Sequence, residues 1–559
     1  MTVTDAPRPA TGLTAAIVGH RLNRIADPLA VQARLEAILR TIDTALRSLA
    51  GDPASPRLRL ISALAEGADQ LAVMAATAAG LDWDAVLPFP VDEYEHDFSA
   101  GAVREGFRAL LTQAGSVLVL DGHGIGPTRD RAYDAAGKAL LDNCDILIAV
   151  WDGLPGRGRG GTRDVVEEAV RRGTPIVSLT PDGGAAVLRL SPPSVNGNVR
   201  LEDLIEASLD GLPDLIGQIV GETVAPPWPP LMSSPRPSWN YSAYPLLLSL
   251  VGLGKSRGKG PAPAEQVAAP VTGALEQAFA WWDEAAVVAA QAFRSAVIVN
   301  FALAAVAVGM AALSLFAGDG KWIFVLAEVA TIMVLLGNTT LAGRRRWQER
   351  WLESREMAEL LRVCLMLRKV GLGRGMAATE DPGWKAWYVQ ALARSQRLEP
   401  ADLSNAAATS CDLVAEVSDQ AAWNEATAHR MHLAGHRIER FGETLFVLVL
   451  AAAIGWLILR LVNPHAAHEL TYTLTAITAG LPAVATASYG IGVILDFEGI
   501  ADRSGRMAAA LRASLAGWDP TRANVAELQG VARQAADIML GDVAAWRLLA
   551  QGRRLKIPG

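Results

Sequence analysis

Apolar and polar positions follow one another in two different ways along the chain, and the pattern changes near residue 270. Upstream of that point, short apolar runs are separated by amphipathic stretches of helical period. The runs predict six strands, at residues 13–18, 58–62, 84–88, 116–120, 146–151 and 175–179. Strands without polar alternation that are separated by helices are typical of a parallel sheet covered on both faces. We therefore predict an α/β domain with a parallel, Rossmann-like sheet over residues 10–225.

Downstream of residue 270 the apolar runs become long enough to cross a membrane, which takes about 20 apolar residues. Four runs predict transmembrane helices, at 296–316, 322–341, 445–462 and 470–495. Their spacing pairs them in two hairpins, within residues 271–344 and 441–500, as an all-α membrane region. Amphipathic patterns predict cytoplasmic helices at 345–440 and 501–559. A Pro-, Ser- and Gly-rich linker covers 226–270, and its apolar patch from Tyr244 to Leu253 is too short to span a bilayer.

Basic residues predict how the spans are oriented. Arg344, Arg345 and Arg346 directly follow the second span, and Arg294 precedes the first. Basic residues also flank the outer ends of the second hairpin, whereas the short loops inside the hairpins carry few. The positive-inside rule therefore places both termini in the cytoplasm of a multi-pass protein of a cell membrane. The first residues, MTVTDAPRPATG, lack the pattern of a cleavable signal peptide.

Composition narrows the classes of function. The chain is 51% hydrophobic and only 19% charged, and this excess lies in the membrane region. A net charge of −7 gives no field that would attract nucleic acid, so we expect no nucleic-acid partner. The three cysteines lack metal-type spacing, and we expect no metal site. His429, His432 and His436 share a helical face, which fits a solvated surface better than a metal.

The main candidate site follows the predicted strand 146–151. Asp152 and Gly153 end this strand, a glycine-rich loop leads to Gly160 and Gly161, and Thr162 precedes a helix as a possible N-cap. Strand, glycine-rich loop and helix N-terminus present backbone N–H groups to an anion such as a phosphate. Asp152 is a candidate acceptor for a ribose hydroxyl or a base amine, or a simple turn cap. The alternative to a phosphate site is that the glycine-rich loop is only a turn that joins the strand to the helix.

Two further segments follow strands at the same predicted edge, because the loops after parallel strands share one edge. One candidate segment starts a helix and comprises Glu66, Gly67, Ala68, Asp69 and Gln70. Its acidic residues also have a simpler explanation, since carboxylates favour helix N-termini.

The other segment follows the first strand and comprises Gly19, His20 and Arg21. There Arg21 is a candidate partner of a phosphate, or merely an exposed loop arginine.

Polar residues inside the predicted spans are the other anomaly. Asn300 lies in the first span and Glu328 in the second. A carboxylate at membrane depth costs roughly 2.5–3.5 kcal/mol and normally faces protein or water. We interpret both as pore-lining or helix-pairing residues; alternatively Glu328 is shallow and protonated, or pairs with Lys321.

Three motifs resemble those of the SLOG superfamily, which includes the DprA-like and LOG-type Rossmann-like domains. They are ISALAEGADQLA (61–72), VLPFPVDEYEHDF (86–98) and CDILIAVWDGLPGRGRGGT (144–162). The hairpins and the run 355–362 resemble the SLATT type of membrane domain found beside SLOG domains. The resemblance implies a membrane effector in which the SLOG-like domain binds a nucleotide-derived signal, of cyclic-nucleotide or ADP-ribose type. An oligomer of such effectors would then permeabilise the inner membrane in prokaryotic antiviral defence.

The resemblance also leaves an enzymatic alternative open. LOG-type enzymes cleave the N-glycosidic bond of nucleotides and carry a glutamate shortly after their glycine–threonine motif. Here the carboxylates come later, as Glu167 and Glu168. We therefore favour a binding pocket without an assigned catalytic residue or firm cofactor over a membrane-anchored nucleotide hydrolase or N-glycosidase.

Overall fold

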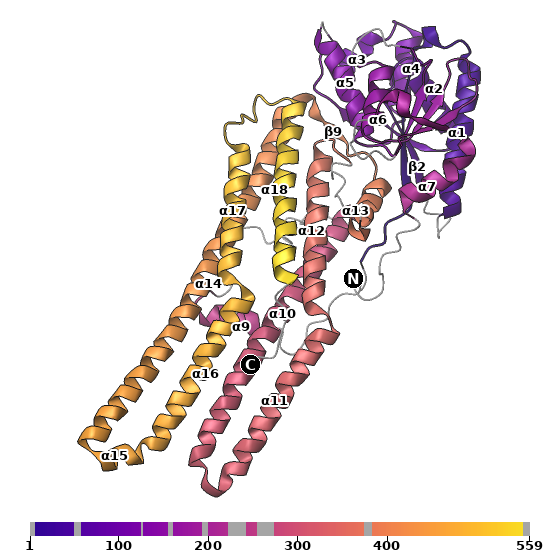
Figure 1. Ribbon diagram of the computed structural model, residues 1–559. Helices are drawn as coiled ribbons and strands as arrows, with labels where there is room; N and C mark the ends of the chain where they lie inside the picture. The colour runs from indigo at the N-terminus through magenta and orange to yellow at the C-terminus, as the bar shows by residue number, and fades with distance from the viewer. Residues whose placement is uncertain are drawn as a thin grey trace.

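The computed structural model describes residues 6–49, 57–124, 127–154, 160–192, 199–221, 242–253, 273–373 and 383–551. An α/β domain lies at one end of an elongated helical region (Figure 1). The strands are β1 (Gly12–Gly19), β2 (Arg57–Ser62), β3 (Asp82–Leu87), β4 (Val117–Val119), β5 (Ile146–Val150), β6 (Ile176–Leu179), β7 (Val187–Leu190), β8 (Ile205–Ala207) and β9 (Ala401–Asp402). The first six coincide with the six predicted strands, which confirms the predicted fold class.

The strands form one sheet in the order β8-β7-β6-β5-β1-β2-β3-β4-β9. The seven strands β6-β5-β1-β2-β3-β4-β9 all pair in parallel with their neighbours in the sheet. At the other edge, β7 pairs antiparallel with β6, and β8 pairs antiparallel with β7. The chain builds outward from β1 to β4 and then returns to place β5 on the other side of β1. The order of strands therefore reverses between β1 and β5, which is the position where sheets of this kind bind ligands.

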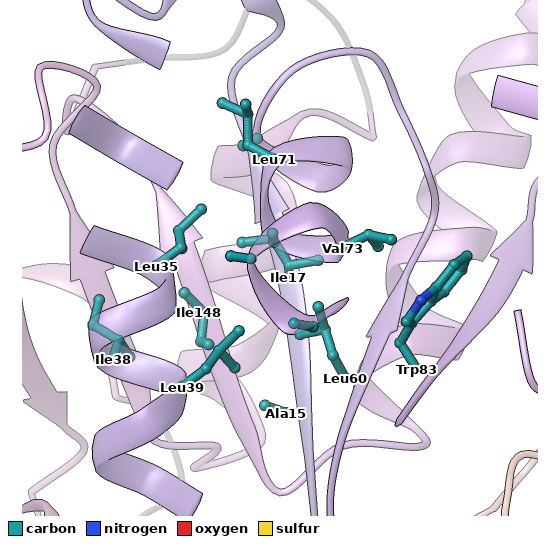
Figure 2. Packing of buried hydrophobic residues seen from close by; sticks show 14 of the residues in the cluster. Ala15, Ile17, Leu35, Ile38, Leu39, Leu60, Leu71, Val73, Trp83 and Ile148 are labelled. Carbon is teal, nitrogen blue, oxygen red and sulfur yellow. The ribbon is translucent and has the colours of Figure 1, made fainter. Parts of the chain in front are cut away.

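Two hydrophobic cores cover the two faces of the sheet. Alternate residues of β1, such as Ala15 and Ile17, face a core shared with α1 (Pro28–Leu49), α2 (Ala68–Ala78) and α7 (Leu212–Val220), part of which Figure 2 shows. Ala16 and Val18 face the second core, to which α5 (Pro127–Leu141) and α6 (Thr162–Arg171) contribute. The remaining helices of the domain are the short α3 (Val91–Tyr94) and α4 (Ala102–Leu111).

The helical region contains α9 (Ala243–Leu250), α10 (Ala274–Leu313), α11 (Lys321–Arg344), α12 (Trp347–Lys369), α13 (Trp384–Ser395), α14 (Ala406–Val462), α15 (Pro464–Glu469), α16 (Thr471–Leu495), α17 (Phe497–Leu515) and α18 (Val525–Gln551). Four of its helices, α10, α11, α14 and α16, are long and apolar enough to cross a membrane. They cover the four predicted spans to within three residues at each end of the span and form the two hairpins visible in Figure 1, although the span predicted to reach residue 316 leaves α10 at Leu313. Most of the linker 226–270 lies outside the described residues.

The four spans lie in a row rather than in a closed bundle. The described contacts run from α11 to α10, from α10 to α16, and from α16 to α14. In each hairpin a residue with left-handed backbone separates the second span from the next helix. This residue is Arg346 (φ 51°) after α11 and Asp496 (φ 54°) after α16. The following helices, α12 and α17, then pack along α10 and α14 respectively.

The helical region is built into the sheet of the α/β domain. Strand β9 pairs in parallel with β4, and α14 begins four residues later at Ala406. Just before β9, the Leu398 amide donates to Asp84 Oδ2 (3.1 Å) and the Ser116 hydroxyl donates to the Leu398 carbonyl (2.7 Å). Side chains of α12, α14 and α18 complete the second core. The two regions therefore share a sheet and a hydrophobic core.

Candidate ligand site

The loops that follow β1, β2 and β5 meet at the carboxyl edge of the sheet. The His20 amide donates to the Val150 carbonyl (3.0 Å), and the Ala68 amide donates to the His20 carbonyl (3.1 Å). The first bond joins the loop after β1 to the end of β5, and the second joins it to the start of α2. Segments 19–21 and 66–70 therefore lie together with Asp152 at the point where the strand order reverses.

Two glycines permit this close approach. A Cβ atom on Gly19 would lie 2.4 Å from Ala68 Cβ and 2.8 Å from Val150 Cβ. Gly67 has a φ of +116°, and a Cβ there would lie 2.5 Å from the His20 carbonyl oxygen. Both glycines are thus required by the packing of backbone on backbone.

Asp152, His20 and Arg24 meet at the end of β5. His20 is buried and its Nε2 lies 3.0 Å from Asp152 Oδ1, while an Arg24 guanidinium nitrogen lies 2.6 Å from Asp152 Oδ2. Partial burial opposes ionisation of Asp152, but the Leu154 amide, His20 and Arg24 outweigh it and lower its pKa. Asp152 is therefore an ionised carboxylate held between two basic side chains. Arg24, which the sequence analysis missed, lies in the short 3-10 helix Leu22–Arg24 directly after β1.

The end of the glycine-rich loop packs against α5. Gly160 has a φ of +77°, and a Cβ there would lie 2.6 Å from the Asp134 amide nitrogen. Its own N–H donates to Asp164 Oδ2 (2.7 Å) in the first turn of α6. The N-cap position belongs to Gly161, so the assignment of Thr162 as N-cap is wrong; Thr162 is the first residue of the helix. Gly153 also has a positive φ, of +80°, with open space around it.

Asp69 is the buried carboxyl of the site. It lies in the first turn of α2, and burial raises its pKa to about 7, opposed by the amides of Ala65 and Ala63 and by Arg21. Its neighbour Gln70 donates to the Leu64 carbonyl (3.3 Å), and Glu66 is half-buried in the same loop. Asp69 is therefore able to exchange a proton near neutral pH.

Arg21 stands at the rim of the site with about half of its side chain exposed. It donates to the Tyr133 hydroxyl (3.4 Å) and lies 3.9 Å from Asp97 Oδ2. Asp97 also pairs with Arg129 and with Tyr133, both on α5. The sequence did not identify Asp97, Arg129 or Tyr133 as residues of the site, although Asp97 lies in the motif 86–98 that carries the resemblance.

The two glutamates considered for catalysis are engaged elsewhere. Glu167 pairs with Arg163 (2.6 Å), and Glu168 pairs with Arg171 and with Arg172 (2.6 Å) on the same helix. These two arginines lower the pKa of Glu168 despite its partial burial. Both carboxylates are thus in ion pairs along α6, and the lowered pKa of Glu168 is the opposite of the raised pKa typical of a general acid.

The opposite, amino-terminal edge of the sheet carries a cleft of about 1460 Å³ between the α/β domain and the helical region. Buried charged side chains line this cleft. The residues predicted for the ligand site at the carboxyl edge are not among its lining residues. Asp145 accepts from the Thr14 amide (2.9 Å) and pairs with Arg394 of α13 (2.9 Å). Arg59 and Asp84 form a second buried pair nearby (3.6 Å). These pairs were not predicted from the sequence. The signal that could have indicated them is the presence of charged residues inside or directly before apolar strands.

The polar residues of the membrane region differ in their surroundings. Asn300 is buried, and its amide donates to Thr339 (2.8 Å) and accepts from Asn338 (2.7 Å), so it joins α10 to α11. Glu328 is partly exposed on α11, and within the described residues no ion pair joins it to Lys321. Asn300 therefore fits the helix-pairing interpretation.

The chain matches no known protein-family model and no curated protein. Among the described residues, no group of three or more His, Cys, Asp or Glu side chains could hold a metal ion.

Proposed function

We propose that the protein is a membrane effector whose α/β domain binds a nucleotide-derived signal and changes the arrangement of its membrane spans. One observation carries the proposal: the loops after β1, β2 and β5 converge at the reversal point of a sheet that the membrane half completes with β9. Ligands of sheets of this kind bind at that point. A ligand there would contact the same sheet that holds the helical region.

The side chains at this edge fit a ligand with phosphate and ribose groups. Arg21 is exposed at the rim and offers a guanidinium for a phosphate, and Arg24 and His20 flank the Asp152 carboxylate. Asp152 would accept from a ribose hydroxyl after a shift of the Arg24 side chain. The resemblance to SLOG domains supports the same class of ligand, either a cyclic nucleotide or an ADP-ribose derivative.

The apolar faces of the spans are largely exposed within one chain. Less than a third of the apolar window of each span is buried within one chain, and none of it in α14. Lipid or further copies of the chain must therefore cover these faces. We propose that homo-oligomers of this protein, in a prokaryotic inner membrane with both termini cytoplasmic, permeabilise the bilayer during antiviral defence, as the resemblance to SLOG and SLATT proteins implies.

A leakage assay tests the proposal. Full-length protein in dye-loaded liposomes receives a panel of cyclic nucleotides and ADP-ribose derivatives, while a thermal-shift assay measures binding in detergent. We expect one ligand class to bind and to release dye. Arg21→Ala should weaken this binding, whereas the control Arg40→Ala, at an exposed pair on α1, should not. Binding without leakage would refute the effector role, and no binding by any ligand would refute the site.

A second function, hydrolysis of a nucleotide-derived substrate, is favoured by Asp69. A carboxyl with a pKa of about 7 is suited to general acid–base catalysis, whereas Glu167 and Glu168 are held in ion pairs along α6. Mass spectrometry of each ligand after incubation with the full-length protein distinguishes the two functions. Product formation that Asp69→Asn abolishes would establish the enzyme, and an intact ligand would exclude it for that compound.

A further inference from the structure

A short helix outside both hairpins, α9, packs where the spans leave the apolar zone. The Tyr244 amide donates to Ser295 Oγ on α10 (3.0 Å), and Tyr244 and Leu248 lie in a hydrophobic cluster with residues of α10, α11, α14 and α16. At the other end of α9, Arg437 of α14 donates to the Val251 carbonyl. Helix α9 therefore reaches from the first span to the third, at the end of the hairpins nearer the α/β domain (Figure 1).

The opposite face of α9 is apolar and uncovered. Leu246 is 59% exposed and Leu250 is 76% exposed, whereas Tyr244 and Leu248 are buried. Leucines four residues apart lie on one side of a helix, so these two form a continuous apolar face. An apolar face beside the ends of membrane spans is typical of a helix that lies in the membrane interface.

Arginines lie on or next to the helices that share a hydrophobic cluster with α9. The Arg294 guanidinium lies between the rings of Tyr244 and Trp351, 4.9 Å from each centroid. Arg344 and Arg345 follow the second span, are exposed, and take part in no ion pair among the described residues. Exposed arginines at the ends of spans attract anionic lipid headgroups, and tryptophan and tyrosine rings favour the same depth.

We propose that α9 is an interfacial helix that buries Leu246 and Leu250 in the leaflet facing the α/β domain, and that Arg344 and Arg345 bind anionic lipid headgroups beside it. The membrane surface would thereby become a ligand of the protein. A lipid-seated α9 holds the first and third spans at a fixed depth, because it contacts both α10 and α14. If the α/β domain acts on the spans as proposed above, the lipid charge would then influence the same helices.

Fluorescence quenching tests the position of α9 in the full-length protein. A dye is attached to Leu246→Cys or Leu250→Cys in a background with Cys411→Ser, because Cys411 is the exposed cysteine and Cys144 and Cys364 are buried. Liposomes of phosphatidylcholine and phosphatidylglycerol contain nitroxide-labelled lipids as quenchers. We expect both dyes to be quenched. The matched control is the exposed Leu29→Cys on α1, which should stay unquenched.

Two results would overturn the position of the helix. The first is an unquenched dye at both leucines. The second is self-quenching between labelled copies without lipid quenching, which would show that a second copy of the chain covers α9 instead.

Lipid binding is tested separately by native mass spectrometry of phosphatidylglycerol retained on the protein. Arg344→Gln and Arg345→Gln should each weaken retention about fivefold, the factor equivalent to ~1 kcal/mol per basic residue at a membrane surface. The control Arg131→Gln removes an exposed arginine from α5 of the α/β domain and should leave retention unchanged. Equal retention by all three variants would overturn the assignment of the headgroup site.

Discussion

The buried pair between Asp145 and Arg394 allows the union of the two regions to be tested quantitatively. The Asp145 side chain is 1% exposed, and it accepts from the Thr14 amide as well as from Arg394. Burial lowers the pKa of Arg394 to about 10, so the guanidinium keeps its positive charge at neutral pH. Arg394→Met keeps most of the packing volume but leaves a buried carboxylate without its cation. Removing one partner of a buried pair costs about 3–5 kcal/mol.

Differential scanning fluorimetry of the full-length protein in detergent measures this cost. For a unit of the size of the α/β domain, the loss corresponds to a fall in Tm of about 10 °C. The control Arg163→Met removes an exposed pair with Glu167 and should lower Tm by less than about 2 °C. Adding Asp145→Asn to Arg394→Met should restore part of the loss, because the buried charge is then gone. Equal shifts for Arg394→Met and Arg163→Met would refute the reasoning.

Three further predictions concern the site and the membrane region. Burial raises the folded-state pKa of Asp69 from 3.8 to about 7, so its contribution to stability is complete below about pH 4 and is lost as the pH rises through 7. The variant Asp69→Asn should therefore flatten this part of a curve of Tm against pH, and an unchanged slope would contradict the assignment. Asn338→Ala breaks the bond to Asn300 and should cost about 1 kcal/mol in SDS unfolding, unlike Thr340→Ala on an exposed face. Gly67→Ala should lower Tm by several degrees more than Gly80→Ala, since only the former would meet backbone atoms; equal effects would exclude the steric argument.

The sequence was sufficient to predict the sheet where strands are long apolar runs. Runs such as 146–151 must be buried on both faces, which leaves few alternatives to a central parallel strand. The three strands it missed are short: β7 has four residues, β8 has the sequence Ile-Glu-Ala, and β9 has two residues. Nothing within residues 401–402 indicates a partner that lies almost 300 residues earlier in the chain. The sequence therefore predicted two separate regions connected by a linker, whereas in the structure the helical region adds a strand to the sheet and shares the second core.

The candidate site was predictable in its backbone but not in its side chains. Gly19 and Gly67 were correctly placed at one edge, because loops after parallel strands share it. The ion pairs of Arg24 with Asp152 and of Arg129 with Asp97 join residues that lie far apart in the sequence. Each arginine alone resembles a solvated surface residue, and only the fold brings it to its carboxylate.

The length of α14 has a mechanical consequence. This helix runs unbroken from Ala406 to Val462, about 85 Å, from the edge of the sheet to the far end of the second hairpin. A continuous helix transmits rotation or axial displacement along its own axis. The chain from α11 to α12 and from α16 to α17 is instead interrupted at Arg346 and Asp496, where the backbone is left-handed. A tilt of β9 would therefore reach α14 through the 3-10 helix Leu403–Asn405, whereas α16 would follow only as far as its side chains mesh with those of α14.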